Sequence, residues 1–168
     1  VGRKNTVKTI NAFFNFKNAS KLKKLKRNTD LICAANAICH VPDLKDLIKG
    51  IDFLLGPKGF FIFEEPYLGS MFKKTSYDQI YDEHIFMFSV SSVKKVFNLF
   101  NFELIDVQPQ ITHGGSMRYV IARKNFYKIK KNVSRYLQLE QKNHIDVIRG
   151  CLNFKKNCEI SKKRLIKK

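Results

Sequence analysis

The chain has 168 residues, 44% of them hydrophobic, so it can bury a sizeable core and should be globular rather than disordered. Its net charge of +18 is confined to the flanks, because residues 1–29 and 124–168 hold the basic excess and the middle is slightly acidic. No recognisable module accompanies the lysines, so we expect no nucleic-acid partner. Four cysteines without paired spacing, and no apolar run of about 20 residues, predict a cytoplasmic protein with no membrane partner.

Apolar and β-branched runs predict five strands. They lie at 6–10, 31–35, 60–63, 102–107 and 117–122. The runs at 31–35 and 60–63 are apolar throughout, which indicates strands buried on both faces of a parallel sheet. Gly56–Gly59 is predicted as a turn before the third strand, and Pro66 as its end. The last two strands are too close in sequence for a helical crossover, so they should pair antiparallel.

Helices are predicted from capping residues and apolar spacing. They run from 18 to 26 with Asn18 as N-cap, from 44 to 55 with Asp43 as N-cap, and onward from a cap at Ser89 or Ser91. Beyond residue 126 apolar positions recur every three or four residues until Gly150 interrupts them, which predicts two basic helices, the second with a weak apolar face. Strands alternating with helices predict an α/β fold with a mostly parallel sheet.

Acid–base groups gather in the stretch Gly56–Ser89. Glu64 and Glu65 follow an apolar strand, at the edge where ligands bind in open α/β sheets. The cluster Tyr81–His84 lies between apolar runs, surroundings that can shift its pKa values. Adjacent carboxylates on a strand point to opposite faces, so we expect no metal here.

Five blocks of sequence carry a resemblance to a known family. They are TINAFF at 9–14, DLICAANAICHVPDL at 30–44, FEEPYLG at 63–69, TSYDQIYDEHIFMFS at 75–89 and ELIDVQPQITHGGSMRYVIAR at 103–123. The blocks resemble class I S-adenosylmethionine-dependent methyltransferases, and more closely the sugar C-methyltransferases that act on nucleotide-linked keto-deoxysugars. The resemblance implies a Rossmann-like methyltransferase sheet, S-adenosyl-L-methionine as cofactor and a nucleotide sugar as substrate.

The chain also departs from that family. Members carry an amino-terminal zinc module, a glycine-rich cofactor loop and a carboxy-terminal lobe, whereas residues 1–60 here contain no GxG, and Ala12 replaces a frequent acid. We therefore expect a methyltransferase domain incomplete at its N-terminus over 1–125, followed by a basic helical extension over 126–168. The alternative is a non-catalytic or split fragment, with a second chain supplying the missing N-terminal half.

The catalytic candidates are His84, Glu83, Tyr81 and His40. Imidazole titrates near neutrality, so His84 can act as a general base supported by Glu83 and Tyr81. The resemblance implies that it removes the proton on sugar carbon 3, next to the 4-keto group, and that His40 hydrogen-bonds the enolate oxygen. The residues alone leave two alternatives open, a solvated polar loop at Tyr81–His84 and a structural role for His40.

Binding roles are assigned on the same basis. The cofactor-binding candidates are Phe13, Ala35 and Asn36, and the substrate-binding candidates are Tyr67, His113 and Arg118. Two glycines between His113 and Arg118 allow a tight turn with exposed N–H groups, and Arg suits phosphate. Two alternatives stay open. One is that Phe13 is an ordinary core residue, and the other is that the turn between His113 and Arg118 binds no ligand. Cys33 and Cys39 are expected to be buried thiols.

Overall fold

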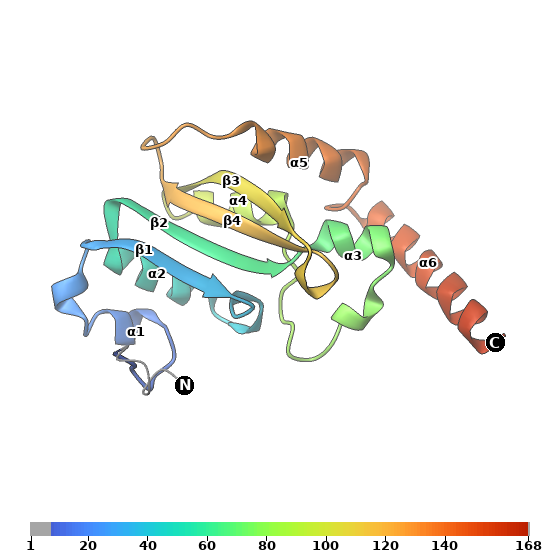
Figure 1. Cartoon of the computed structure of the whole chain (residues 1–168), viewed down its shortest axis with the longest axis horizontal. Coiled ribbons are helices and arrows are strands. Elements are labelled where there is room, and N and C mark those ends of the chain that lie inside the picture. Colours follow the sequence, from blue (N-terminus) through green and yellow to red (C-terminus); the bar gives the residue numbers. More distant parts are fainter. Residues whose placement is uncertain (1–7, 168) are drawn as a thin grey trace.

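The computed structural model describes residues 8–167, and its centre is a four-stranded sheet (Figure 1). The strands are β1 (Thr29–Ala35), β2 (Leu55–Pro66), β3 (Phe102–Gln110) and β4 (Ser116–Arg123), in spatial order β1-β2-β4-β3. β1 and β2 are parallel, and β4 is antiparallel to both of its neighbours. The predicted α/β sheet with its antiparallel hairpin is confirmed. The strand predicted at 6–10 begins outside the described residues, and 8–10 form no strand.

Six α-helices occur among the described residues. They are α1 (Phe16–Ala19), α2 (Leu44–Leu54), α3 (Leu68–Lys74), α4 (Val90–Asn98), α5 (Lys131–Lys142) and α6 (Ile148–Ile166). Asp43 caps α2 as predicted, and Ser89 caps α4 in a capping box with Ser92. The helix predicted at 18–26 is wrong. α1 ends at Ala19, and the lysine-rich residues after it form only a 3₁₀ turn at 23–25 with nothing buried, so packing cannot stabilise a longer helix there.

The Gly56–Gly59 segment lies within β2, so the turn predicted there is wrong. Thr29 pairs with Leu55 while Leu31 pairs with Phe60, and the extra residues of β2 therefore bulge between these two pairs. A Cβ atom on Gly59 would come within 2.7 Å of the Thr29 carbonyl oxygen. Gly59 is therefore needed for the close approach of β1 and β2, and not for a turn.

One face of the sheet packs against α2 and α4 and forms the core, behind the sheet in Figure 1. Phe61 and Phe63 of β2 are buried in it, and Phe63 stacks on Tyr119 of β4 with ring centroids 4.8 Å apart. β1 is an edge strand, and on its outer face Leu31 is 52% exposed and Cys33 is exposed. The burial predicted for both faces of this strand, and for Cys33, is wrong because no element within residues 8–167 covers that face.

The start of α5 is tied to β3 by a buried carboxylate. Asp106 accepts hydrogen bonds from Lys130 Nζ at 3.0 Å and from Asn132 Nδ2 at 3.3 Å. Burial raises the pKa of Asp106, but hydrogen bonds from Gln108 and Lys130 and the Lys130 charge outweigh it, so that pKa lies below its ordinary value.

The end of α5 is tied to the rest of the fold by Glu140, which is 1% exposed. Its carboxylate accepts from the Val90 and Ser91 N–H groups at 2.6 and 2.8 Å, and from the Tyr67 hydroxyl at 2.9 Å. The N–H groups of the first turn of a helix lack helical partners, so a carboxylate at the start of α4 is favourable. α5 is thus packed on the sheet, while the domain boundary placed between 125 and 126 stays a prediction.

α6 points away from the sheet (Figure 1), and its apolar face is weak as predicted, since Ile148 and Leu152 are exposed. Its buried residue Phe154 stacks on Phe72 of α3 with centroids 4.8 Å apart. The two predicted basic helices are confirmed, but they separate at 143–147 rather than at Gly150, which lies in the first turn of α6.

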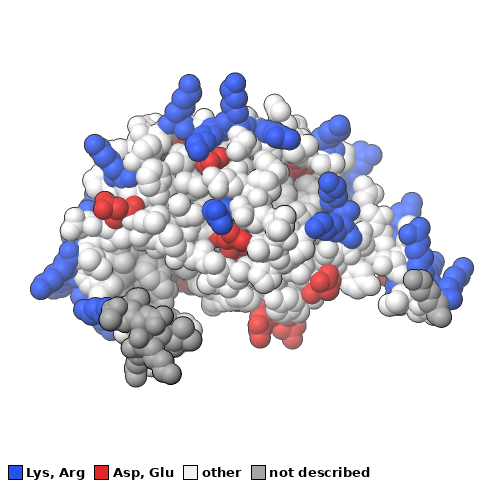
Figure 2. Space-filling view, viewed as in Figure 1, with Lys and Arg blue, Asp and Glu red and all other residues white. Residues whose placement is uncertain are grey.

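The surface charge follows the partition seen in the sequence. Lys and Arg side chains lie over α5 and along α6, whereas acidic ones gather below, over the segment between α3 and α4 (Figure 2). That segment contains Asp78, Asp82 and Glu83, all exposed. No helix within residues 8–167 is both long and apolar enough to cross a membrane.

Asp106→Asn should make the free energy of unfolding depend less steeply on pH in the acidic range. The folded-state pKa of Asp106 lies below its unfolded value of about 3.9, so its stabilisation is complete above that value and is lost as pH falls through the folded pKa. Urea unfolding between about pH 5 and pH 2 should show a steeper loss of unfolding free energy in the wild type than in the variant. Parallel curves would contradict the assignment.

Candidate functional site

The candidate site lies at the carboxyl ends of β1 and β2. β1 ends at Ala35, and Asn36 follows with a positive φ of 49°, which Asn tolerates better than most residues. The Asn36 N–H donates to the Glu64 carbonyl at 2.9 Å, so the loop leaves β1 against the end of β2. A 3₁₀ turn at Ile38–His40 then buries Cys39 and leaves His40 half-buried.

A fully buried carboxylate holds this loop. Glu65 Oε1 accepts from the Ala37 N–H at 2.9 Å and from the Ile38 N–H at 2.6 Å. Glu65 Oε2 has no hydrogen-bond partner among the residues that the structure describes. Burial, and then the Glu65 carboxylate, raise the pKa of Cys39 to about 12, so its thiol is protonated at neutral pH. The prediction that Cys39 is a buried thiol is confirmed.

The Tyr81–His84 segment packs on the same loop. The Ile85 and Phe86 N–H groups donate to the Cys39 carbonyl at 3.0 and 3.3 Å. These bonds bring together two blocks that lie more than forty residues apart in the sequence.

The hydrogen bonds of His84 define its tautomer. Nδ1 lies 2.9 Å from the Gln79 carbonyl oxygen, which can only accept, so Nδ1 carries the proton. Nε2 then accepts from the Tyr81 hydroxyl at 2.7 Å. Burial, Cys39 and Glu83 raise the pKa of Tyr81, so its phenol is protonated and can donate. The predicted contact between Tyr81 and His84 is confirmed.

His40 completes the cluster. Its ring lies beside that of His84, with centroids 5.1 Å apart, and its Nδ1 is 2.7 Å from the Glu83 carbonyl oxygen. Nδ1 therefore donates and Nε2 carries the lone pair. The Glu83 carboxylate forms no direct hydrogen bond with His84, because both ring nitrogens of His84 have other partners. Glu83 instead contributes its carbonyl to His40. The predicted tuning of His84 by Glu83 stays a prediction.

A hollow of about 940 Å³ opens beside this cluster, between the segment before α1, β1 and the loop after β1. Phe13, Asn36 and His40 line it together, whereas Ala35 does not. Phe13 is 91% exposed, so the alternative of a core position is wrong. The hollow has the size of a small-molecule site.

The three residues predicted to bind substrate do not line this hollow. Tyr67 is buried and its hydroxyl is bonded to Glu140. Arg118 forms an ion pair with Glu64 at 3.0 Å, and His113 lies in the hairpin loop between β3 and β4 with a positive φ. Their binding roles stay predictions.

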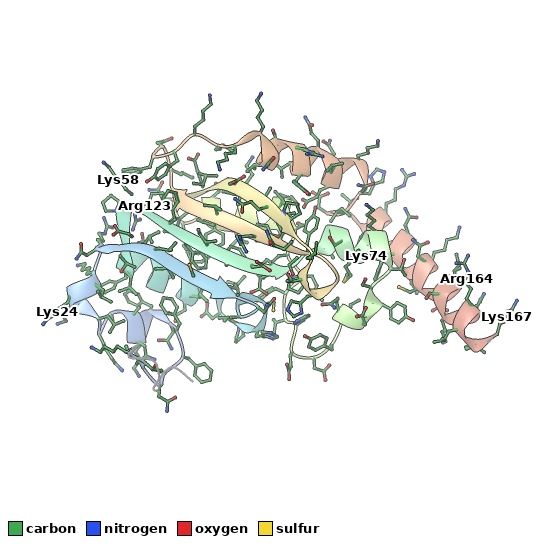
Figure 3. The ribbon with its side chains drawn as sticks, viewed as in Figure 1. Lys24, Lys58, Lys74, Arg123, Arg164 and Lys167 are labelled. Carbon is green, nitrogen blue, oxygen red and sulfur yellow. The ribbon has the colours of Figure 1, made fainter. Side chains whose placement is uncertain are left out.

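The hairpin loop itself is a tight turn, as predicted. Gly114 and Gly115 both have positive φ, and a Cβ atom on Gly115 would come within 2.6 Å of Ser70 Oγ. Lys74 of α3, labelled in Figure 3, donates to the Gly114 carbonyl, so the loop is fastened to α3.

The family model described as "Methyltransferase domain" matches residues 3–107. The chain belongs to this family. S-adenosyl-L-methionine, which the sequence resemblance implies, is the methyl donor expected for a domain of this family. The hollow fits part of that molecule, because Phe13 offers an exposed ring for the adenine and Asn36 offers a polar group at the end of β1. The glycine-rich loop that would complete the cofactor contacts is not found in residues 8–60.

One curated protein and two solved structures are similar to the chain. It is 31% identical over 111 residues to the C-methyltransferase NovU of Streptomyces niveus, a match covering 66% of this chain and 26% of that protein. The PH0226 protein of Pyrococcus horikoshii OT3 aligns with a TM-score of 0.51 at 18% identity. A SAM-dependent methyltransferase of Anabaena variabilis aligns with a TM-score of 0.52 at 15% identity. Both structural matches cover 73% of this chain and 62% of the other, and they confirm the Rossmann-like methyltransferase fold. The chain thus spans about a quarter of its curated relative.

Sequence reasoning missed two groups that build the site. The role of Glu65 in holding the loop after β1 is one of them, although Phe61, Phe63 and Glu65 alternate along β2 and therefore point to the same buried face. The Gln79 carbonyl, which sets the His84 tautomer, leaves no signal in the sequence because any residue carries a carbonyl.

Glu65→Ala should lower the free energy of unfolding by about 3 kcal/mol, because two backbone N–H groups lose a charged acceptor. Glu64→Ala is the matched control. Its side chain points to the opposite face and pairs with the partly exposed Arg118, a contact that contributes about 1 kcal/mol or less. Urea unfolding of both variants measures the difference, and equal losses would show that Glu65 does not hold the loop.

Proposed function

We propose that this chain is the catalytic part of a C-methyltransferase that methylates a carbon of a nucleotide-linked keto-deoxysugar. The observation that carries the proposal is the Tyr81–His84–His40 cluster beside the hollow at the end of β1. Methylation of carbon requires removal of a C–H proton, and a positioned imidazole is suited to that task. The relative named as a C-methyltransferase supports the same reaction class. The bound cofactor supplies an electrophilic methyl group on a sulfonium.

His84 supplies the base. With Nδ1–H fixed on the Gln79 carbonyl, Nε2 is its basic atom, and the Tyr81 hydroxyl occupies that atom here. We infer that the substrate displaces this hydroxyl and that Nε2 takes the proton from carbon 3 of the sugar. The C–H electron pair moves into the enolate, and the Gln79 carbonyl stabilises the imidazolium that forms.

His40 supplies the enolate contact in this proposal. Its Nδ1–H is already donated to the Glu83 carbonyl, so it can donate to an enolate oxygen only from Nε2, as an imidazolium. The displaced Tyr81 hydroxyl is a second donor within the same cluster. The proposed step therefore uses a neutral His84 as base, and either an imidazolium at His40 or the Tyr81 phenol as the donor to the enolate oxygen.

His84→Ala should strongly slow exchange of the carbon 3 hydrogen of a nucleotide-linked 4-keto-deoxysugar with D₂O. The test uses a polypeptide that joins this chain to the preceding strands of a methyltransferase domain. Because the base is lost, exchange followed by NMR should slow at least about 100-fold, while binding of S-adenosylhomocysteine is unchanged. His144→Asn, in the turn after α5, is the control and should exchange like the wild type. Retained exchange in His84→Ala would remove His84 from the base role.

The second candidate is a split or non-catalytic fragment. It is favoured by the open edge of β1 and by the exposure of Leu31 and Cys33 on its outer face, because an uncovered apolar sheet face is typical of a partner site. A second polypeptide would then supply the strands and the glycine-rich loop that complete the cofactor site.

Calorimetric titration of this chain with S-adenosylhomocysteine separates the two candidates. The hollow offers only part of the cofactor contacts, so we expect no micromolar binding by the chain alone. Binding should be restored when a polypeptide containing the missing strands is added. Micromolar affinity of the chain alone would contradict the split arrangement.

A further inference from the structure

Three side chains with metal-binding atoms meet at the cluster. One donor atom from each of Cys39, His40 and His84 lies within 4.8 Å of the others. Around a tetrahedral zinc ion, with bonds of about 2.0–2.3 Å, neighbouring donors are about 3.5 Å apart. The three side chains thus need to approach only slightly to share one ion.

Both histidines already have the surroundings of metal ligands. Each donates Nδ1–H to a backbone carbonyl, His40 to Glu83 at 2.7 Å and His84 to Gln79 at 2.9 Å. Metal-bound histidines are usually held by such a bond from the second ring nitrogen, which fixes the tautomer and leaves the first free to bind. The Nε2 of His40 has no partner among residues 8–167, and that of His84 is bonded only to the exposed Tyr81.

A buried carboxylate, that of Glu65, lies next to one of these ligands, Cys39. Glu65 is fully buried, its carboxylate acts on the Cys39 thiol by a hydrogen bond and by its charge, and its Oε2 has no nitrogen or oxygen donor within the described part of the chain. An unpaired carboxylate oxygen in the interior is unfavourable, and a cation beside it would offset that cost.

We propose that Cys39, His40 and His84 form a binding site for a thiophilic divalent cation, with Zn²⁺ as the best match. One sulfur and two imidazole donors suit zinc, and three protein ligands leave a fourth position for solvent. On binding, the Cys39 thiol loses its proton to solvent and its sulfur bonds to the metal. The expectation of no metal considered only Glu64 and Glu65, and this site uses other residues.

The site has a consequence for turnover, and that consequence rests on the proposed function. A cation bound to His84 Nε2 occupies the lone pair that would take the substrate proton, and it displaces the Tyr81 hydroxyl. Zinc would therefore inhibit the enzyme by sequestering its base, and a chelator would reverse the inhibition.

Titration of this chain with Co²⁺, followed by absorption, tests the site. The expected result is one ion per chain, with a thiolate-to-cobalt charge-transfer band and the intense d–d bands of a tetrahedral complex. Cys39→Ser should remove the charge-transfer band, and His40→Gln should weaken binding at least about tenfold. Cys33→Ser is the matched control, because this exposed thiol lies on the outer face of β1, and it should leave the spectrum unchanged.

Two outcomes would overturn the site: a charge-transfer band that persists in Cys39→Ser, or one that disappears in Cys33→Ser. Circular dichroism of each variant verifies its fold, and His40→Gln, at a half-buried position, gives a second readout should the Cys39 variant unfold. Inhibition is read separately, from the D₂O exchange of the joined polypeptide with and without equimolar Zn²⁺. Absent exchange without metal would contradict the proposed function, whereas the cobalt spectrum alone decides the site.

Discussion

The candidate site depends on the buried carboxylate of Glu65 at the end of β2. Burying a carboxylate is unfavourable unless it is well hydrogen-bonded, and Glu65 Oε1 meets this condition by binding the Ala37 and Ile38 N–H groups. The same bonds fix the loop after β1, so the ends of two parallel strands are joined by one side chain. Cys39 and His40 follow directly in that loop, and the Cys39 carbonyl in turn holds the segment after His84. A local electrostatic requirement thus positions both histidines.

Glu140 applies the same principle at the other side of the fold. Its carboxylate satisfies the first N–H groups of α4 and the Tyr67 hydroxyl, so α5 is attached through a polar contact inside the core. This explains why the side chain of Tyr67, which follows the polar end of β2, packs against Tyr136 and Glu140 of α5. Its hydroxyl has a charged acceptor in the interior, and such a bond is stronger than one between neutral groups.

The elements that the sequence predicts well are those specified by local patterns. The apolar runs of β1 and β2, the Asp43 and Ser89 caps and the β3–β4 hairpin each depend on a few neighbouring residues. Glycine is ambiguous, because Gly56–Gly59 would suit a turn as well as the bulge that it forms. Glu140 lies seven residues after Val133, so the helical spacing places both on the buried face of α5. Its charge, however, favours an exposed position when only the sequence is considered. Contacts between the 38–40 turn and the Tyr81–His84 segment cannot be read from either alone, because they depend on how the chain folds back.

The hydrogen bonds that hold the two histidines and the loop after β1 all come from residues 37–86, in the segments on either side of β2. The hollow proposed for the cofactor, by contrast, is bordered by β1, the edge strand of the described sheet. Acid–base geometry and cofactor affinity therefore have different physical sources in this protein. The first is built into the loops by buried carboxylate and carbonyl acceptors, and the second depends on covering an exposed strand edge. In the proposed mechanism, a chain with this division keeps His84 in position whether or not the methyl donor is bound, so proton exchange and cofactor binding can be tested separately.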